Sequence, residues 1–128
     1  IAQWALYCGA LDIPMFFLSG DEAACKEARE FIPQITAVSV KKGVGINSAV
    51  SLSKESAREK IKKGVVEAVL KFKKKPIAPL KWPGDYILEI QFYSKETANG
   101  YLSNFNCEKI DEKTVRFKST NILDIIYA

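Results

Sequence analysis

The sequence contains no histidine among its 128 residues. Histidine is the most common metal ligand in proteins and the usual general base near neutral pH. A Ser-His-Asp triad or a Cys-His pair therefore cannot be built from this chain alone. The chain also lacks a carboxylate or thiolate cluster with the spacing of a zinc site. Taken by itself, it is expected to hold neither catalytic residues nor metal ligands.

Long hydrophobic runs are lacking as well. The apolar run Met15 to Leu18 is far too short to cross a bilayer, and no signal peptide is visible at the start. We therefore expect no membrane partner. The chain opens on Ile1 inside a predicted helix and ends without a helix stop signal, so we expect both ends to be truncated.

Cysteine is sparse, and its pattern argues against a disulfide framework. Cys8, Cys25 and Cys107 lie far apart, are odd in number and include no C-x-x-C spacing. This usage is typical of a reducing compartment, which predicts a cytoplasmic protein. Each cysteine has apolar neighbours and is interpreted as a small buried hydrophobic residue.

The net charge of +4 reflects lysines that are concentrated in one segment, Lys71 and Lys73 to Lys75. A nucleic-acid interface usually has a broader basic face that also carries aromatic residues. Cations also suit the carboxyl end of a helix, where the helix dipole is negative. We interpret the lysines in this second way and expect no nucleic-acid partner.

The N-terminal part of the chain, up to Val40, predicts a strand–helix–strand unit. Residues 2–11 form a helical pattern, 15–18 a buried strand, and Pro33 ends a helix that Ser19 or Asp21 can cap. Residues 35–40 predict a second strand, and such crossovers join parallel strands. Ser19-Gly20-Asp21 would then lie at the carboxyl end of a parallel strand, where backbone amides can face a ligand.

The remaining residues complete an α/β fold. We interpret residues 41–51, with Gly43 and Gly45, as a flexible connector rather than a phosphate loop. Other elements are expected at 54–72 (a helix that Ser53 begins), 87–92 (a half-exposed strand), 98–105 (a helix capped by Ser94), around Asp111-Glu112 (a strand pair with Val115 and Phe117 on one face) and 122–128 (a helix). The buried stripe of the long helix is predicted as Ala57, Ile61, Val65, Val69 and Phe72.

The prediction is thus a single α/β domain over residues 1–128. It is a three-layer-like lobe whose partly parallel sheet contains the βαβ unit and is flanked by helices, followed by a C-terminal antiparallel strand pair.

Three quoted stretches carry a resemblance to a known family. "CGALDIPMFFLSGDEAACKEAREFIP", the pair Val40-Lys41 with "SLSKESAREKI", and "EKIDEKTVRF…NILDIIYA" together resemble the prokaryotic zinc-dependent D-aminopeptidases related to dipeptide-transport proteins. Gly9-x-x-Asp12-Ile13-Pro14, at a fixed distance from Ser19-Gly20-Asp21, is the most specific part. The resemblance runs over essentially the whole chain.

The resemblance implies a two-lobed cytoplasmic subunit with two zinc ions in a cleft, assembled into stacked rings as a decamer. Family members release N-terminal D-amino acids from short peptides, and their zinc ligands lie mostly in the N-terminal lobe. The last ligand would fall immediately before Ile1, so the present chain is similar to the C-terminal lobe alone, inactive on its own and without the N-terminal lobe. Asp21 and Lys41 match the motif and are the expected substrate-cleft residues.

Two departures from the family pattern leave the substrate's stereochemistry open. Gly45-Ile46 stands where the family commonly has Ser-Arg, and Trp4 stands where an Asn is frequent near the metal. A non-catalytic α/β binding or oligomerisation module remains the alternative hypothesis.

Overall fold

The computed structural model describes residues 1–126 and divides into two compact units. The first runs from Ile1 to Lys81 and the second begins at Trp82. The first unit contains, in chain order, α1 (Ala2–Ala10), β1 (Phe17–Asp21), α2 (Glu22–Phe31), β2 (Thr36–Gly45), β3 (Ser48–Ser51) and α3 (Lys54–Lys74). The second contains β4 (Tyr86–Gln91), α4 (Lys95–Gly100), the 3₁₀ helix η1 (Tyr101–Ser103), β5 (Cys107–Lys109), β6 (Thr114–Ser119) and the 3₁₀ helix η2 (Ile122–Asp124).

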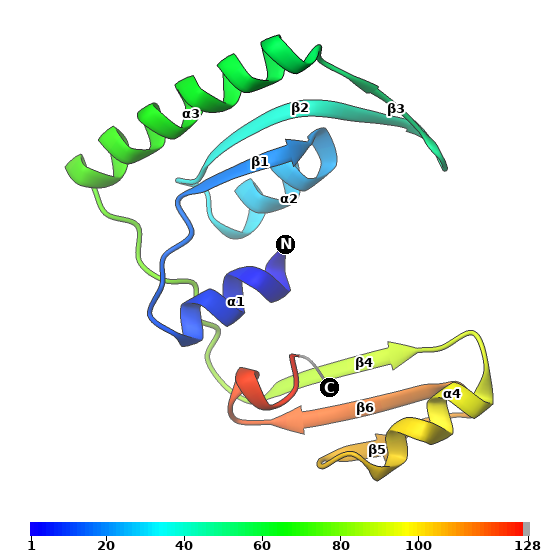
Figure 1. Ribbon diagram of the computed structural model, residues 1–128. Helices are drawn as coiled ribbons and strands as arrows, with labels where there is room; N and C mark the ends of the chain where they lie inside the picture. Colours follow the sequence, from blue (N-terminus) through cyan, green and yellow to red (C-terminus); the bar gives the residue numbers. More distant parts are fainter. Residues whose placement is uncertain (127–128) are drawn as a thin grey trace. The chain divides into compact units, whose positions relative to one another are not determined.

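The first unit is built on the predicted strand–helix–strand crossover. β1 pairs with β2 in parallel, from Phe17 opposite Thr36 onward. Figure 1 shows α2 and α3 on opposite faces of this sheet, and α1 beyond α2. The core between α1, α2 and the sheet contains Ala5, Ala28, Ile32 and Ile35. The three-layer arrangement and the parallel pairing are therefore confirmed.

The segment after the crossover differs from the expected flexible connector. β2 continues to Gly45 and turns back into β3 as an antiparallel hairpin, with a register shift between Gly43 and Gly45. All residues from Lys41 to Ser51 are exposed. The connector prediction failed because it weighted the glycines, whereas Val44 and Val50 have the branched side chains that favour strands. The glycines serve the irregular pairing rather than a loose loop.

α3 packs on the sheet through a stripe that only partly matches the one predicted, since Ala57, Ile61 and Phe72 are partly buried as expected. Gly64 and Ala68 are buried, whereas Val65 and Val69 are 39% and 36% exposed. A Cβ at Gly64 would lie 2.4 Å from Cγ2 of Val38, so the helix approaches the sheet closely at that point. The small residues permit close packing, and a pattern based on side-chain hydrophobicity overlooks them. β1 likewise begins at Phe17, two residues later than the strand predicted from Met15.

The second unit is a three-stranded antiparallel sheet in the order β4-β6-β5. The predicted strand pair is β5 and β6, joined by β4 as a third strand, and Val115 and Phe117 are fully buried on one face. Ser94 caps α4, because its hydroxyl accepts a hydrogen bond from the Thr97 amide at 3.2 Å. The predicted strand pair, with Val115 and Phe117 on one face, and the predicted Ser94 cap are thus confirmed.

The predictions for the helix at 98–105 and for the helix at 122–128 were partly wrong. The helix expected through Phe105 stops at Gly100 and continues only as η1, leaving Phe105 85% exposed. Residues 122–124 form a 3₁₀ turn rather than an α-helix, and residues 127–128 of that prediction lie outside the described part of the chain. Such short segments cannot repeat an α-helical hydrogen-bond pattern long enough to stabilise it. None of the helices between residues 1 and 126 has the length and apolar character that a membrane span requires.

Candidate functional site

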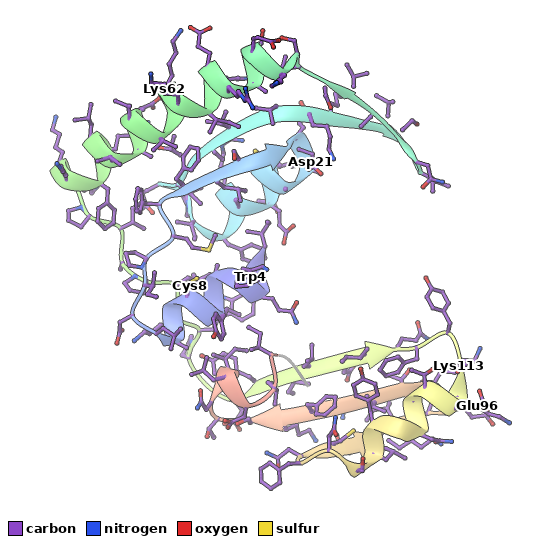
Figure 2. The ribbon with its side chains drawn as sticks, in the orientation of Figure 1. Trp4, Cys8, Asp21, Lys62, Glu96 and Lys113 are labelled. Carbon is purple, nitrogen blue, oxygen red and sulfur yellow. The ribbon has the colours of Figure 1, made fainter. Side chains whose placement is uncertain are left out.

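Asp21 closes β1 and begins α2. Its Oδ1 accepts a hydrogen bond of 2.7 Å from the Ala24 amide, and its backbone is extended, as expected at an N-cap. Figure 2 shows Asp21 at the carboxyl end of β1. One carboxylate oxygen is thus committed to the helix, and a loss of this cap typically costs about 1 kcal/mol.

Lys41 lies directly beside Asp21 in the sheet. The two residues are opposite each other in the β1–β2 register, and this pairing follows a shift after the pair Gly20–Ser39. Val40 is the extra residue on β2, and such a bulge redirects the side chains that follow it. The Lys41 side chain is exposed, and no carboxylate in residues 1–126 forms an ion pair with it. The structure therefore brings Asp21 and Lys41 together.

Other cations surround this end of the sheet. The Lys60 ammonium donates a hydrogen bond of 2.9 Å to the Ser39 carbonyl, and Lys42 forms an ion pair of 3.3 Å with Glu22. Lys60 comes from α3 and Glu22 from α2, so both helices reach this strand end. Lys41 forms no ion pair with a carboxylate of residues 1–126, so the ammonium groups here outnumber the Asp21 and Glu22 carboxylates by one, and the local potential favours an anionic ligand.

Gly20 leaves open space at the same strand end. A Cβ added there would meet only the Ala24 Cβ, at an ordinary contact distance of 3.8 Å. Ser19, which precedes it, is exposed. Gly20 is therefore not required for packing, and its place beside the α2 N-terminus lets a ligand approach the backbone.

The cysteines take no part in this site. Cys25 is buried under it, and burial raises the pKa of its thiol although Arg29 opposes the shift. Burial likewise raises the pKa of the Cys107 thiol. A thiol with a raised pKa is a poor nucleophile at neutral pH. Cys25 is confirmed as a small buried hydrophobic residue, while Cys8 and Cys107 are only partly buried.

Metal ligands do not gather anywhere in the part of the chain that the structure describes. No group of three or more His, Cys, Asp or Glu side chains between residues 1 and 126 could hold a metal ion. The two positions that depart from the family pattern also lie apart from Asp21. Trp4 stands on α1 with its ring edge-on to Tyr7 at 5.9 Å, and Ile46 stands fully exposed at the tip of the β2–β3 hairpin.

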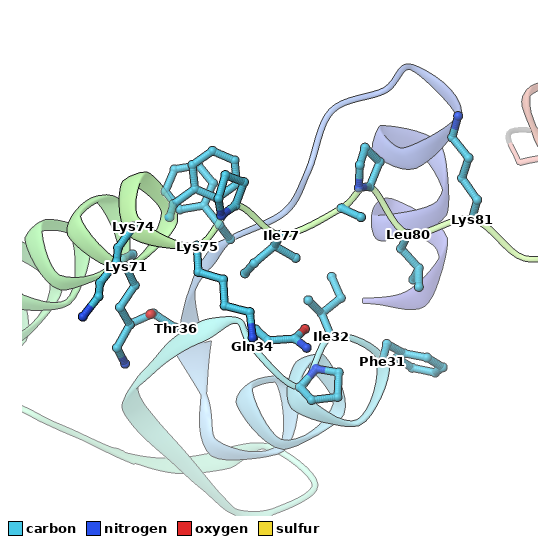
Figure 3. A pocket seen from close by; sticks show the side chains of 17 residues that line it. Phe31, Ile32, Gln34, Thr36, Lys71, Lys74, Lys75, Ile77, Leu80 and Lys81 are labelled. Carbon is cyan, nitrogen blue, oxygen red and sulfur yellow. The ribbon is translucent and has the colours of Figure 1, made fainter.

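A cavity that the sequence did not reveal lies at the other end of the parallel strands. Its volume is about 770 Å³, and its lining includes Phe16, which precedes β1, and Thr36, which begins β2. α3, the segment Pro76–Lys81 and residues 31–34 at the end of α2 form the rest of the wall (Figure 3). Pro76 and Pro79 restrict the backbone of this segment, but nothing in their spacing reveals what the segment encloses.

Three comparisons with known proteins agree. The family model described as D-aminopeptidase matches residues 2–128. The D-aminopeptidase of Bacillus subtilis is 29% identical over 126 residues, a match that covers 97% of this chain and 45% of that protein. The solved structure of the Zn-dependent D-aminopeptidase DppA from Bacillus subtilis, described as a self-compartmentalizing protease, superposes with a TM-score of 0.85 at 25% identity. That match covers 98% of this chain and 45% of that chain. The chain thus spans a little under half the length of these relatives, and it belongs to the D-aminopeptidase family.

Proposed function

We propose that this chain is the C-terminal lobe of a zinc-dependent aminopeptidase that hydrolyses short peptides, and that it is inactive on its own. The observation that carries the proposal is the family match over residues 2–128, together with the confirmed fold. That match spans 45% of the Bacillus subtilis enzyme, which leaves room for a second lobe. Peptides that begin with D-amino acids are the substrates to test first, and a cytoplasmic location is part of the proposal.

The zinc ligands are proposed to lie on polypeptide outside these residues, the last of them immediately before Ile1. The donors within residues 1–126 do not fit a zinc site, because they include no histidine and no carboxylate or thiolate group of three. The work of this lobe is therefore to bind and orient the substrate rather than to hold the metal.

Asp21 and Lys41 are proposed to line the substrate cleft. Lys41 offers an exposed ammonium without an ion-pair partner among the described carboxylates, and a short peptide carries a free carboxylate that would pair with it. Asp21 holds the N-terminus of α2 in place beside it through its hydrogen bond to Ala24. In this arrangement Lys41 binds substrate and Asp21 is a positioning residue.

The location of the metal site is tested by comparing this chain with the complete protein. Residues 1–128 are expected to retain less than about one tenth of a zinc ion per chain after dialysis and to hydrolyse no dipeptide. The complete protein is expected to retain zinc and to hydrolyse the dipeptide. Far-UV circular dichroism first establishes that the isolated chain is folded. Stoichiometric zinc or appreciable hydrolysis in the folded chain alone would refute the proposal.

The role of Lys41 is tested in the complete protein with a matched neighbour as control. Lys41→Gln is expected to raise KM for a dipeptide about 10-fold with little change in kcat, because a hydrogen bond to a charged group contributes about 1.5 kcal/mol or more. Lys42→Gln removes the same charge one residue away, from a side chain already paired with Glu22, and should leave KM within about 2-fold. Equal effects of the two variants would show that only the net charge matters.

We also propose that the complete protein self-associates, in a decameric ring. The similar Bacillus subtilis structure is described as self-compartmentalizing. In this chain the β2–β3 hairpin exposes Val44, Ile46 and Val50, an apolar set that a partner copy would cover. Analytical ultracentrifugation of the complete protein measures the mass of the assembly. Ile46→Ser is expected to shift the distribution of assemblies toward smaller species. A monomer at micromolar concentration would contradict this proposal and leave the metal and cleft proposals standing.

A further inference from the structure

The cavity between α3, the start of the sheet and the segment Pro76–Lys81 has the size of a small-molecule site. Its volume of about 770 Å³ falls within the range of about 300–1,000 Å³ that such sites occupy. It lies wholly within the first unit. It is also remote from Asp21, since Phe17 and Asp21 are at opposite ends of β1, about 13 Å apart at the usual rise per residue.

The inner wall of the cavity is apolar. Phe16 and Phe72 stack with ring centroids 4.7 Å apart, and Ile32 and Ile77 also line the cavity. Figure 3 shows the Ile77 and Ile32 side chains converging from the Pro76–Lys81 segment and from the end of α2. Such a surface favours a hydrocarbon chain, at about 25 cal/mol per Å² of apolar surface removed from water.

The rim is strongly basic. Four lysines line the cavity, namely Lys71, Lys74, Lys75 and Lys81, and none of the acidic residues that the structure describes does so. Lys71 is paired with Glu67 and Lys81 with Asp12, whereas Lys74 and Lys75 form no ion pair with any described carboxylate. Figure 3 shows the Lys75 side chain extending toward Gln34, which also lines the cavity and adds an amide donor.

The α3 dipole does not cancel this charge. Its carboxyl end lies at Lys74 and carries a partial negative charge of about 0.5. Its Lys71 carbonyl is already satisfied by a hydrogen bond from the Lys75 amide at 2.8 Å. The two unpaired ammonium groups exceed the dipole charge about fourfold, so the rim attracts anions.

We propose that this cavity binds a carboxylate with an unbranched hydrocarbon chain, such as a medium-chain fatty acid. The carboxylate lies against Lys75 and the Gln34 amide, while Lys74 adds positive charge to the rim, and the chain lies between the Phe16–Phe72 pair and Ile77. An apolar wall and a basic rim in one cavity match such a ligand at both of its ends. This site is separate from the proposed peptidase cleft, so neither proposal depends on the other.

The proposal is tested by isothermal titration of the complete protein with decanoate below its micelle concentration. Decanoate is expected to bind with a stoichiometry of one per chain. 1-Decanol, which lacks the charge, and acetate, which lacks the chain, are each expected to bind at least 10-fold more weakly. Equal affinity for decanoate and 1-decanol would overturn the role of the lysines, and the absence of decanoate binding would overturn the whole proposal.

Two double variants with the same change of charge locate the site. Lys74→Gln with Lys75→Gln is expected to weaken decanoate binding at least 10-fold. Lys62→Gln with Lys73→Gln removes two α3 lysines that do not line the cavity. This variant should change the affinity for decanoate less than 2-fold. Circular dichroism verifies that both variants fold. Equal weakening in the two variants would show a non-specific charge effect and refute the site.

Discussion

Replacing Gly9 by alanine should destabilise the first unit by about 2 kcal/mol, the balance between a cost of overpacking and a gain in helix propensity. A Cβ at Gly9 would lie 1.8 Å from the Leu80 carbonyl oxygen and 2.8 Å from the Leu80 carbonyl carbon. Both distances are shorter than any real Cβ contact, and the obstacle is backbone rather than a flexible side chain, so the Leu80 segment must withdraw. Overpacking of this kind costs up to about 3 kcal/mol. Alanine recovers about 1 kcal/mol, because it favours the helix more than glycine does.

Gly20→Ala is the matched control for this prediction, since both glycines belong to the stretch that resembles the D-aminopeptidase family. At Gly20 the new Cβ meets nothing closer than 3.8 Å, so the free energy of unfolding should change by less than about 0.5 kcal/mol. Urea denaturation followed by far-UV circular dichroism measures both variants. A Gly9→Ala protein as stable as the Gly20→Ala control would refute the close approach of α1 to Leu80.

Two further predictions concern α3 and the second sheet. Gly64→Ala should destabilise the chain by about 1 kcal/mol in urea, because its Cβ would lie 2.4 Å from the Val38 side chain while helix propensity offsets part of the cost; an increase in stability would contradict the packing of α3 on β2. The Glu108 carboxylate accepts a hydrogen bond from Lys118, and this bond lowers the pKa of Glu108 below 4.5. The stabilisation that Glu108 contributes is therefore present above pH 4.5 and is lost as the pH falls through the lowered pKa. Glu108→Gln should therefore reduce the dependence of the urea midpoint on pH between 3 and 5, and an unchanged profile would refute this coupling.

Local patterns were sufficient to predict the crossover and the small antiparallel sheet. The strand–helix–strand order follows from an apolar run, an N-cap and Pro33, all of which act within a few residues. The α2 cap was predicted as Ser19 or Asp21 and the α4 cap as Ser94, and the structure shows Asp21 and Ser94 accepting the backbone hydrogen bonds. Such features depend on neighbouring residues only, which is why one sequence suffices to find them.

The hairpin, the α3 stripe and the cavity were not predicted in the same way. The α3 stripe and the cavity depend on contacts between segments that are distant in the chain, whereas the hairpin is local and was missed because Gly43 and Gly45 were interpreted as a loose loop. Gly64 is buried only because Val38 and Phe17 lie against it, and no hydrophobicity scale marks a glycine as a core residue. The cavity forms only where Phe16 and Phe72 meet, and these two residues lie far apart in the sequence of the first unit. The pairing of Asp21 with Lys41 also required the bulge at Val40, which shifts the register by one residue.

The motif Gly9-x-x-Asp12-Ile13-Pro14 has a structural explanation that is independent of catalysis. Gly9 permits the approach of Leu80, and Asp12 has a positive φ of 59° and forms an ion pair with Lys81 at 2.6 Å. Both contacts hold the last residues of the first unit against α1. The ion pair is exposed and contributes at most about 1 kcal/mol, so the close approach at Gly9 is the stronger constraint.

It follows that the motif which most clearly indicated the family has a structural role in the first unit, where it holds the Leu80–Lys81 segment against α1. Its residues fix the wall segment that encloses the lysine-rimmed cavity, at the end of the strands remote from Asp21 and Lys41. A variant at Gly9 should therefore alter decanoate binding through Leu80 before it alters the proposed cleft. The two strand ends can accordingly be separated by experiment, because Lys41→Gln acts at one and the Lys74/Lys75 double variant at the other.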